Sequence, residues 1–430
     1  MYANPAESCQ SGGAATAAER ETAMSDSHDS GKTTTGTRKS AAVSQADAVL
    51  ARPGAMRRSR RWRGGPARGA RGRRVILAAA AAGALAATLL GAPPARADGC
   101  NLRFLYNVDG SPAWPSAPVT SYTSCSDTPA IVRYAGGTTI ASNADVTDAF
   151  NTYVNTDGSP NWWKNDGWGG GGTIGPLAVT PYSGGTEFAI PYNNELLYDW
   201  ETGGQPMPLS GRAELVASSG ISLFAPAIAR NSAGTVIAAT GQDNSLWFYW
   251  NADGSPAWGS HLVAGPGSVQ GAPAIAVTGN GTEIAFIAPD ASLWFYWNIN
   301  GTSTWWPEEV SGPGTVWGGV AMTHSYGGTQ ISVPGPGGSL MFFWNYDGTS
   351  TWHPQQVAGP GTVQGAPAMA AGNYTEEIAV TATDGSLRYY WSYDGTTTWY
   401  GAQIAPPGTA STSPAITRSS GGTEIAVDGP

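Results

Sequence analysis

Apolar residues in this chain form short, unbroken runs that are separated by turns and show no helical period. The stretch SLWFYWNADGSPAW at 245–258 is the clearest example, and SLMFFWNYDGTSTW at 339–352 has the same order. Residues 246–251 do not alternate between polar and apolar types, which predicts a strand buried on both faces. The Asp-Gly pair that follows supplies the positive φ that a hairpin turn needs. A second strand is expected to end near Val263.

Two more strands complete the unit. A Gly-Pro-Gly loop at 265–267 leads into a small-residue strand at 272–277 and then a last strand at 282–287. Small residues suit the crowded innermost position of a radial sheet, where strands of different sheets approach each other. Four short strands in about 45 residues are typical of one blade of a β-propeller.

The unit recurs seven times, at spacings of 47, 47, 50, 47, 47 and 47 residues. The anchor residues are Leu102, Ala149, Leu196, Leu246, Leu293, Leu340 and Leu387. The fold class predicted for residues 98–430 is therefore all-β, a seven-bladed β-propeller of 47-residue, four-stranded repeats. Units two and three are the least regular, because Asn161 and Pro208 stand where five other units carry a tryptophan.

The two ends of the repeat region complete each other. The last unit stops after TEIAV at 423–427, and the strand that should come next is found at 101–106. We therefore expect N- and C-terminal strands to share one blade, which would remove open sheet edges that invite aggregation.

Composition and charge narrow the function classes. With 59 Gly, 31 Pro, 18 Trp and 17 Tyr, the chain is turn-rich and has the aromatics of a packed core. Residues 98–430 hold only 7 of the 22 Lys and Arg but 25 of the 31 Asp and Glu, a formal charge of −18. Binding to nucleic acid or to an anionic membrane needs a basic surface, so neither is an expected partner.

The first 97 residues have a different character. Residues 1–56 are expected to be disordered or an over-extended start, since Met56 directly precedes an arginine-rich run. Residues 57–97 have the order of a signal peptide: a basic segment, an apolar stretch at 75–90, and Ala95-Arg96-Ala97 as cleavage site. This order predicts a secreted, extracellular protein that leaves the membrane on cleavage. The alternative is an uncleaved anchor, for which about 16 apolar residues are short.

Cysteine usage agrees with export. Cys9 lies in the part removed on cleavage, which leaves Cys100 and Cys125. In an exported chain this pair predicts one disulfide bond that closes a loop of about 25 residues. A lipid-modified Cys100 is the alternative, although Ala97-Asp98-Gly99 lacks the aliphatic residue of such sites.

Catalytic and metal-binding motifs give little support for an enzyme. Beyond residue 97 the histidines are His261, His324 and His353, at unrelated repeat positions, and no CxxC or HxxEH spacing predicts zinc. There is no phosphate loop and no GxSxG elbow. The hairpins at 345–352 and 392–399 resemble the Asp-box of sialidase propellers or half of a calcium loop, and we interpret them as turns. No metal, cofactor or catalytic residue is therefore predicted.

One recurring set of residues suits sugars. Twelve residues after the anchor, five units carry a tryptophan, and thirty-seven residues after it four carry a glutamate or glutamine, with Glu187 shifted by one. These residues are Trp114, Trp258, Trp305, Trp352 and Trp399, and Glu283, Gln330, Glu377 and Glu424. Indole stacks on the C–H face of a sugar and carboxylates accept from its hydroxyls. With almost no basic residues nearby, the carboxylates are expected to face water, backbone N–H groups or a ligand.

Structural roles are also open for these residues. The tryptophans four residues after the anchor are expected to fill the interfaces between blades: Trp250, Trp297, Trp344 and Trp391. Those at +12 either cap the hairpin or bind a ligand, and the glutamates either bind or are simply solvated.

The SLxFYW…DG…W…GTEIA pattern of 98–430 resembles secreted lectin propellers, namely the fucose-specific lectin superfamily and seven-bladed bacterial lectins with one sugar pocket between successive blades. The resemblance implies multivalent binding of glycans or glycoconjugates and adds Arg388 as a binding residue. Fucose-binding members pair an arginine with a glutamate, and only Arg103 and Arg388 occupy the matching place here. The sugar and the oligomeric state stay open. The alternatives are a scaffold that binds proteins and a glycan-cleaving hydrolase or lyase.

Overall fold

The structure is a computed structural model of the 430-residue chain, which divides into two units, Met1–Ala86 and Ala87–Pro430. It describes residues 100–430 apart from 110, 124–127, 144–148, 158, 160, 170–171, 203–212, 254, 256, 301, 326, 373–374 and 394–395. The predicted N-terminal extension (1–56), the predicted signal peptide (57–97) and Cys125 lie outside the described residues.

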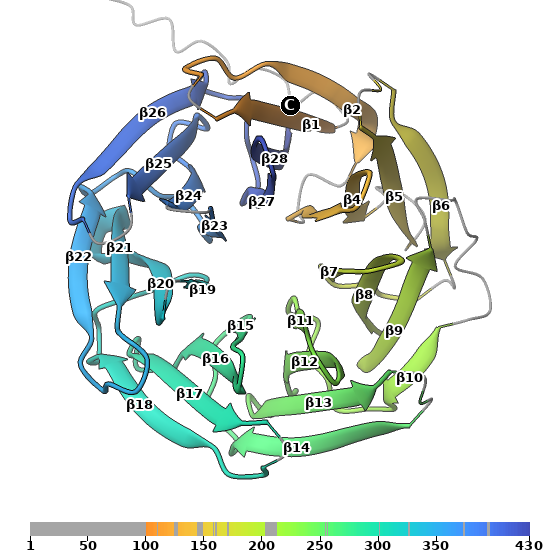
Figure 1. The fold of residues 1–430 in the computed structure, drawn as a ribbon, viewed down its shortest axis with the longest axis vertical. Coiled ribbons are helices and arrows are strands. Elements are labelled where there is room, and N and C mark those ends of the chain that lie inside the picture. The colour runs from red at the N-terminus through yellow and green to blue at the C-terminus, as the bar shows by residue number, and fades with distance from the viewer. Residues whose placement is uncertain are drawn as a thin grey trace, which may run out of the picture. The chain divides into compact units, whose positions relative to one another are not determined.

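The described residues form seven four-stranded antiparallel sheets arranged as the blades of a propeller (Figure 1). We number the blades I to VII in ring order and give their strands from the innermost outward. Blade I contains β27 (Ala415–Ser419), β28 (Gly422–Gly429), β1 (Cys100–Val108) and β2 (Ser116–Thr123). Blade II contains β3 (Ala130–Tyr134), β4 (Gly137–Asn143), β5 (Ala149–Thr156) and β6 (Trp163–Gly169). Blade III contains β7 (Ala178–Tyr182), β8 (Gly185–Tyr192), β9 (Glu195–Thr202) and β10 (Glu214–Ala217).

The remaining four blades repeat this plan. Blade IV contains β11 (Ala227–Asn231), β12 (Gly234–Thr240), β13 (Leu246–Ala252) and β14 (Trp258–Ala264). Blade V contains β15 (Ala274–Val277), β16 (Gly281–Ile287), β17 (Leu293–Ile299) and β18 (Trp306–Ser311). Blade VI contains β19 (Ala321–Ser325), β20 (Gly328–Gly335), β21 (Ser339–Trp344) and β22 (His353–Ala358), with a short 3₁₀ turn η1 (Pro336–Gly338) before β21. Blade VII contains β23 (Ala368–Ala371), β24 (Thr375–Thr381), β25 (Leu387–Tyr393) and β26 (Trp399–Ala405).

The predicted closure of the ring is confirmed. β1 pairs with β28 over eight residues, from Asn101 opposite Gly429 to Val108 opposite Gly422. Figure 1 shows these two strands, the beginning and the end of the propeller, side by side in one blade. The seven-bladed, all-β prediction is therefore correct in its blade number and in its shared terminal blade.

The aromatic third strand of each blade packs against both neighbouring blades, as its lack of alternation predicts. In β13, Leu246 and Phe248 belong to an apolar cluster with Ile284 of blade V. The next residues along, Trp247 and Tyr249, pack on the opposite side in a cluster with blade III. The hydrophobic core is thus divided into clusters between the blades, and the stability of the ring depends on blade-to-blade contact.

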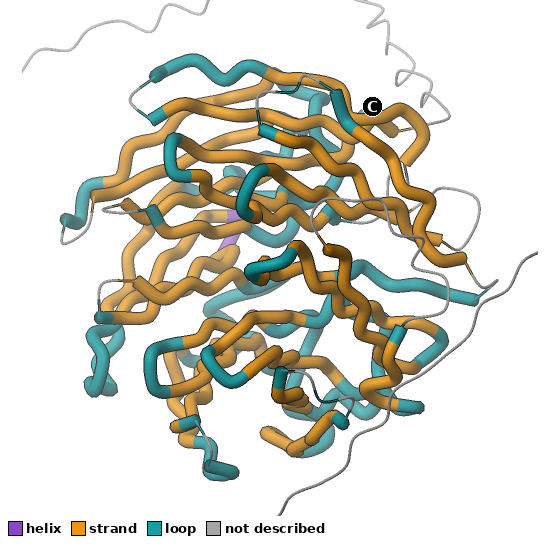
Figure 2. Tube along the Cα trace, turned by 45° about the vertical axis from the view of Figure 1, so that its right-hand side comes forward, coloured by secondary structure: helices purple, strands orange, loops and turns teal. Residues whose placement is uncertain are grey.

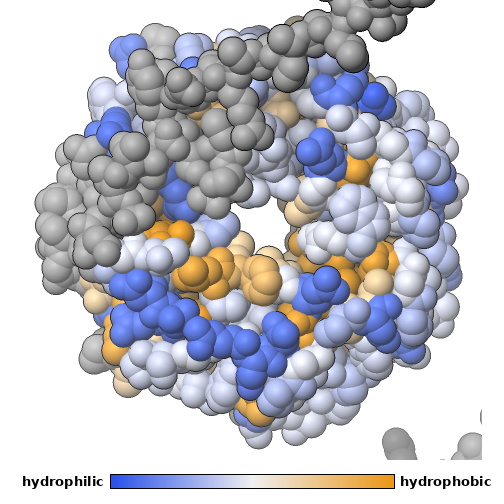
Figure 3. All heavy atoms as spheres, turned by 180° about the vertical axis from the view of Figure 1, so that it is seen from behind, coloured by the Kyte–Doolittle hydropathy of each residue, from blue (hydrophilic) through white to orange (hydrophobic). Residues whose placement is uncertain are grey.

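Loops join the strands at the ends of the blades, and helix is nearly absent from the described residues (Figure 2). Seen from behind, the ring has an opening at its centre, bordered in part by apolar residues (Figure 3). None of the described helices has the length and apolar composition needed to cross a bilayer.

Candidate functional site

Buried ion pairs connect adjacent blades at three of the seven junctions. At each, a glutamate on the second strand of one blade contacts an arginine on the first strand of the next. The pairs are Glu424 with Arg133 at junction I/II, Glu187 with Arg230 at III/IV, and Glu377 with Arg418 at VII/I. Junction V/VI has the same plan, with His324 in place of the arginine and Glu283 as its carboxylate.

Each of these glutamates has a second partner on the next blade. A threonine hydroxyl donates to the carboxylate at 2.5 Å from Thr138 to Glu424, 2.7 Å from Thr235 to Glu187 and 2.6 Å from Thr423 to Glu377. Each arginine in turn reaches an aspartate of the Asp-Gly turn in its own blade, namely Asp157, Asp253 or Asp109. Burial raises the pKa of Glu187, Glu377 and Glu424, while the threonine and the guanidinium oppose that rise.

The expectation that these carboxylates face water or a ligand for lack of basic partners is therefore wrong. Six arginines are enough, because three of them recur at one repeat position, 31 residues after the anchor (34 in the unit with the insertion), where Arg133, Arg230 and Arg418 lie. His324 lies at +31 as well, although the histidines as a group follow no common position. The shared spacing of these four cations was the signal in the sequence that reasoning from residue counts missed.

At the other three junctions the glutamate and the cation are lost together. At IV/V their places are taken by Val236 and Val277, and at VI/VII by Gln330 and Ala371. Gln330 accepts a hydrogen bond from Ser325 of its own blade at 3.1 Å. The glutamate and its cation are expected to be replaced together, because a buried charge that loses its partner lowers the unfolding free energy by about 3–5 kcal/mol.

Junction II/III follows a different plan. Thr139 and Pro181 stand at the glutamate and arginine positions, and a carboxylate comes from the other blade instead: Thr139 donates to Glu201 at 2.9 Å. Among the described residues no basic side chain lowers the pKa of Glu201, and burial raises it to about 7. This carboxyl group therefore holds its proton over much of the mildly acidic range.

The tryptophans at +12 lie at the blade interfaces. Each indole packs on the aromatic residue at +2 of the preceding blade, with ring centroids 4.7 to 5.1 Å apart. The pairs are Trp114–Tyr389, Trp258–Tyr198, Trp305–Phe248, Trp352–Phe295 and Trp399–Phe342. Blade II is less irregular than its sequence indicates, because Trp162, one residue after Asn161, packs on Phe104 in the same way at 5.0 Å.

The indole N–H groups divide these tryptophans into two sets. Those of Trp258, Trp352 and Trp399 donate to an outer-strand residue of the preceding blade, Glu214, Glu308 and Gln355 respectively, at 3.1 to 3.2 Å. The equivalent residue is His261 for Trp305 and Ala402 for Trp114, and each of these two tryptophans lines a cavity. Trp305 and Trp114 are thus the predicted tryptophans with access to a ligand.

Cavities lie at four junctions, each bounded by the third strand of one blade and the turn between the third and fourth strands of the next. Their volumes are about 480 Å³ at III/IV, 400 Å³ at IV/V, 110 Å³ at VI/VII and 680 Å³ at VII/I. The +4 tryptophans Trp200, Trp250, Trp344 and Trp391 line them in that order. Trp250, Trp344 and Trp391 were expected to fill the blade interfaces, so the sequence did not predict their place at the cavity walls, and Trp200 was not singled out.

The cavity at IV/V has an exposed tryptophan in its wall. Trp250 is 43% exposed and lies over Gly259, where an added Cβ would come within 2.3 Å of the indole Cε2. In blades V and VI the residue equivalent to Gly259 is aromatic, and Trp306 and His353 stack on the +4 tryptophan. Glycine therefore leaves room for the Trp250 indole to lie flat against the strand.

The other walls of this cavity are aromatic and neutral polar. Phe248 and Trp305 add apolar surface. Amides, hydroxyls and an imidazole complete the lining, from His261, Asn251, Asn298, Asn300 and Thr302. No carboxylate is among its described lining residues, because Val236 replaces the junction glutamate. Aromatic walls with a few converging hydrogen-bond groups are the chemistry of a small-molecule site.

The cavities at III/IV and VII/I are charged by comparison. The first includes Glu187, Glu214, Asp253 and Arg230 in its lining. The second includes Glu377, Asp109 and Arg418. Glu377 and Gln330 are the predicted polar residues that line a described cavity, the latter at VI/VII. Glu283 and Glu424 face His324 and Arg133 across their junctions.

The three paired arginines also border a separate cavity of about 650 Å³, formed by the hairpins between first and second strands. Arg133, Arg230 and Arg418 come together there, which the sequence did not predict. Each guanidinium already contacts two carboxylates, so the site does not offer three free positive charges to an anion.

Two other predicted residues have separate positions. Arg388 lies at the second position of β25, near Asp384 of the preceding loop, and lines none of the cavities described above. Cys100 is buried in β1, and the bond to Cys125 stays a prediction because Cys125 is outside the described residues.

No protein-family model matches the sequence, and a search of curated proteins found no match. Solved structures do match. The BP39L lectin from Burkholderia pseudomallei superposes with a TM-score of 0.56 at 17% identity, covering 69% of this chain and 90% of that chain. This chain shares that lectin's fold. The predicted resemblance to lectin propellers is confirmed at this level, and at 17% identity it shows the fold alone.

Two further structures match less closely. A fungal lectin from Aleuria aurantia, described as a six-bladed β-propeller with a novel fucose recognition mode, has a TM-score of 0.43 at 15% identity, covering 65% of this chain and 96% of that chain. The polysaccharide lyase Uly1 has a TM-score of 0.46 at 10% identity, covering 70% and 89%. Both scores are below 0.5, so neither carries an argument about this chain.

Proposed function

We propose that this protein is a lectin-like, carbohydrate-binding propeller and that its principal site is the cavity at junction IV/V. The observation that carries the proposal is the exposed Trp250 indole over Gly259, facing a 400 Å³ cavity that also contains Trp305 and several amide and hydroxyl groups. An apolar sugar face stacks on indole, and sugar hydroxyls exchange hydrogen bonds with amides and hydroxyls. The lectin fold of BP39L adds support at the level of the class of ligand.

Binding is favoured over glycan cleavage at this site because its described lining contains no carboxyl group. Hydrolysis of a glycosidic bond generally uses two carboxyl groups on either side of the bond. The described residues that line the IV/V cavity include none. Similar cavities at III/IV, VI/VII and VII/I provide further, chemically different sites, so one molecule would bind a glycan-coated surface with avidity.

A glycan array with the purified protein tests the proposal. We expect saturable binding to a set of related glycans, at least about tenfold weaker in Trp250→Ala, since tryptophans that a ligand covers are typical affinity hot spots. Trp163→Ala is the matched control, because Trp163 is 50% exposed on the outer strand β6 and lines none of the cavities described above. Absence of binding to any glycan by the folded protein, or equal loss in both variants, would contradict the proposal.

We also propose export by cleavage after Ala97, on the basis of the basic segment, apolar stretch and small-residue site in the sequence. N-terminal sequencing of protein recovered from the culture medium is expected to begin at Asp98. Protein that stays in the cell with residues 57–97 intact would contradict export.

A further inference from the structure

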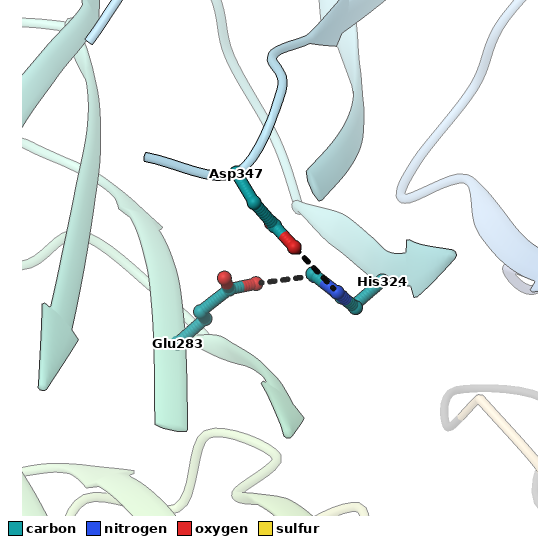
Figure 4. A group of neighbouring side chains, drawn as sticks. All are labelled: Glu283, His324 and Asp347. Carbon is teal, nitrogen blue, oxygen red and sulfur yellow. Dashed lines mark ion pairs between the residues drawn. The ribbon is translucent and has the colours of Figure 1, made fainter. Parts of the chain in front are cut away.

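Junction V/VI has a histidine where the other ion-paired junctions have an arginine. His324 of β19 lies between two carboxylates, with Nδ1 3.4 Å from Glu283 Oε2 and Nε2 3.6 Å from Asp347 Oδ2 (Figure 4). Glu283 belongs to β16 of blade V, and Asp347 to the turn between β21 and β22 of blade VI. The imidazole therefore connects two blades and the base of an exposed turn.

The sister junctions show what this position does. At III/IV, Arg230 contacts Glu187 of the preceding blade and Asp253 of its own Asp-Gly turn. Arg133 and Arg418 make the same two contacts at I/II and VII/I. In all three the cation is permanent, because a guanidinium keeps its proton at any physiological pH. Only at V/VI is the equivalent cation one that titrates near neutrality.

The position of the ring between two carboxylates favours the charged form of the histidine. Each ring nitrogen faces a different carboxylate, and a neutral imidazole has a single N–H to donate. On loss of one proton, one nitrogen presents its lone pair to a carboxylate oxygen, which is repulsive. One donor atom from each of these three residues lies within 4.8 Å of the others, so a bound metal ion is the alternative arrangement, and the Zn²⁺ experiment below separates it from the latch.

The surroundings provide no replacement charge. From β16 the group that faces His324 is Glu283, 7% exposed, which also accepts a hydrogen bond from Thr329 of β20 at 2.8 Å. From the turn it is Asp347. The inner strands on either side, β15 and β23, contain Ala, Ile, Val and Met and no titratable side chain. Among the described residues that face this junction, His324 is therefore the one that can carry a positive charge.

We propose that His324 is a pH-dependent latch between blades V and VI: its imidazolium holds Glu283 and Asp347 together, and loss of its proton weakens the junction and releases the Asp347 turn. The three junctions that contain an arginine, I/II, III/IV and VII/I, keep their contacts over the same pH range. Junction V/VI therefore loosens as the pH rises, next to the turn that contains Asp347.

The direction of the pH dependence follows from the carboxylates. Glu283 and Asp347 raise the pKa of His324 above its ordinary 6.5 by hydrogen bonding and charge, and burial opposes them. A group with a raised pKa stabilises the fold fully below its unfolded-state pKa and loses that contribution as the pH rises through the folded-state value. The latch is therefore closed below about pH 6.5 and opens above it.

Thermal unfolding between about pH 5 and 8 tests the latch in three variants. His324→Arg copies the sister junctions and is expected to remove the part of the fall in melting temperature with pH that His324 causes. His324→Gln copies the neutral state and is expected to match the unsubstituted protein at high pH and melt lower at low pH. Arg230→His should in turn add a second fall with rising pH at junction III/IV. The titration of Glu201 is common to all variants and cancels in the comparison.

Two results would overturn the latch. The first is a His324→Gln profile parallel to that of the unsubstituted protein across the whole pH range. The second is a rise in melting temperature on adding equimolar Zn²⁺ at neutral pH that disappears in His324→Gln, which would assign the three residues to a metal site instead. Hydrogen exchange that accelerates with pH in β16 and β19 in excess of the chemical rate, and not in β8 and β11, is the local result we expect.

Discussion

The two sides of blade IV solve the same packing problem in opposite ways. On the side of blade III, Glu187 and Arg230 form a buried pair that is continued to Asp253. On the side of blade V, the equivalent positions are Val236 and Val277, and the space next to them is an uncharged cavity with an exposed Trp250. The same backbone repeat thus accepts either a charged or an apolar pair of residues at the junction between blades, provided that both residues of the pair change together.

Breaking the charged side should have the largest effect. Arg230→Ala leaves Glu187, whose side chain is 3% exposed, without its cation, and we expect unfolding free energy to fall by about 3–5 kcal/mol. Copying the other side with Glu187→Val and Arg230→Val together should cost less than about 1.5 kcal/mol. Chemical denaturation measures both, and a double variant as unstable as the single would contradict the pairing.

The reverse exchange charges the apolar side. Val236→Glu places a carboxylate at junction IV/V with no cation opposite, and we expect a loss of about 3 kcal/mol. Adding Val277→Arg should restore most of it, since the pair then matches III/IV. Chemical denaturation of the single and double variants measures the two unfolding free energies. If the double variant is no more stable than Val236→Glu alone, the two positions do not act as a pair.

Junction II/III is a third solution, a carboxyl group without a cation, and it predicts a pH effect. Burial raises the pKa of Glu201 from 4.5 to about 7, so the folded state binds a proton that the unfolded state has lost. Stability is then full below about pH 4.5 and falls as the pH rises to about 7, by up to about 3 kcal/mol.

The variant Glu201→Gln keeps the hydrogen-bonding shape and removes the titration. It should match the unsubstituted protein near pH 4.5 and be more stable than it near pH 8. Urea unfolding at the two pH values measures this difference. Equal stability of both proteins at both values would argue against a proton held by Glu201.

The smallest effect on stability is expected at Gly259. Gly259→Trp copies Trp306 of blade V and should displace or cover the Trp250 indole, lowering glycan affinity by about tenfold while unfolding free energy changes by about 1 kcal/mol or less. The control is Gly265→Ala, where an added Cβ meets no atom within 4 Å. Unchanged glycan affinity in Gly259→Trp would show that Trp250 does not contribute to glycan binding.

The fold was predictable because its signals are local and repeated. The unbroken aromatic run at Leu246 and the Asp-Gly turn fix one blade, and the 47-residue spacing multiplies it to seven. The ends of the chain then dictate closure, which the pairing of Leu102 with Asp428 confirms. The strand order, the blade number and the closure can all be predicted without knowing the side-chain contacts between blades.

The site was predictable only in part, because it depends on contacts between repeats. Trp305 and Trp352 occupy the same repeat position. The repeat pattern does not reveal that the indole N–H of Trp352 donates to Glu308 whereas Trp305 lines a cavity. The carboxylates were interpreted without their arginines, since Glu187 and Arg230 are 43 residues apart. Comparing the same position across all seven repeats would have paired them.

A crystal structure of the protein with the glycan that binds best on the array tests the central claim most directly. The claim predicts a sugar ring against the Trp250 indole, with hydroxyls in contact with the amides of the IV/V cavity. A sugar bound only at the cavity bordered by Arg133, Arg230 and Arg418, or on the outer strands, would contradict it.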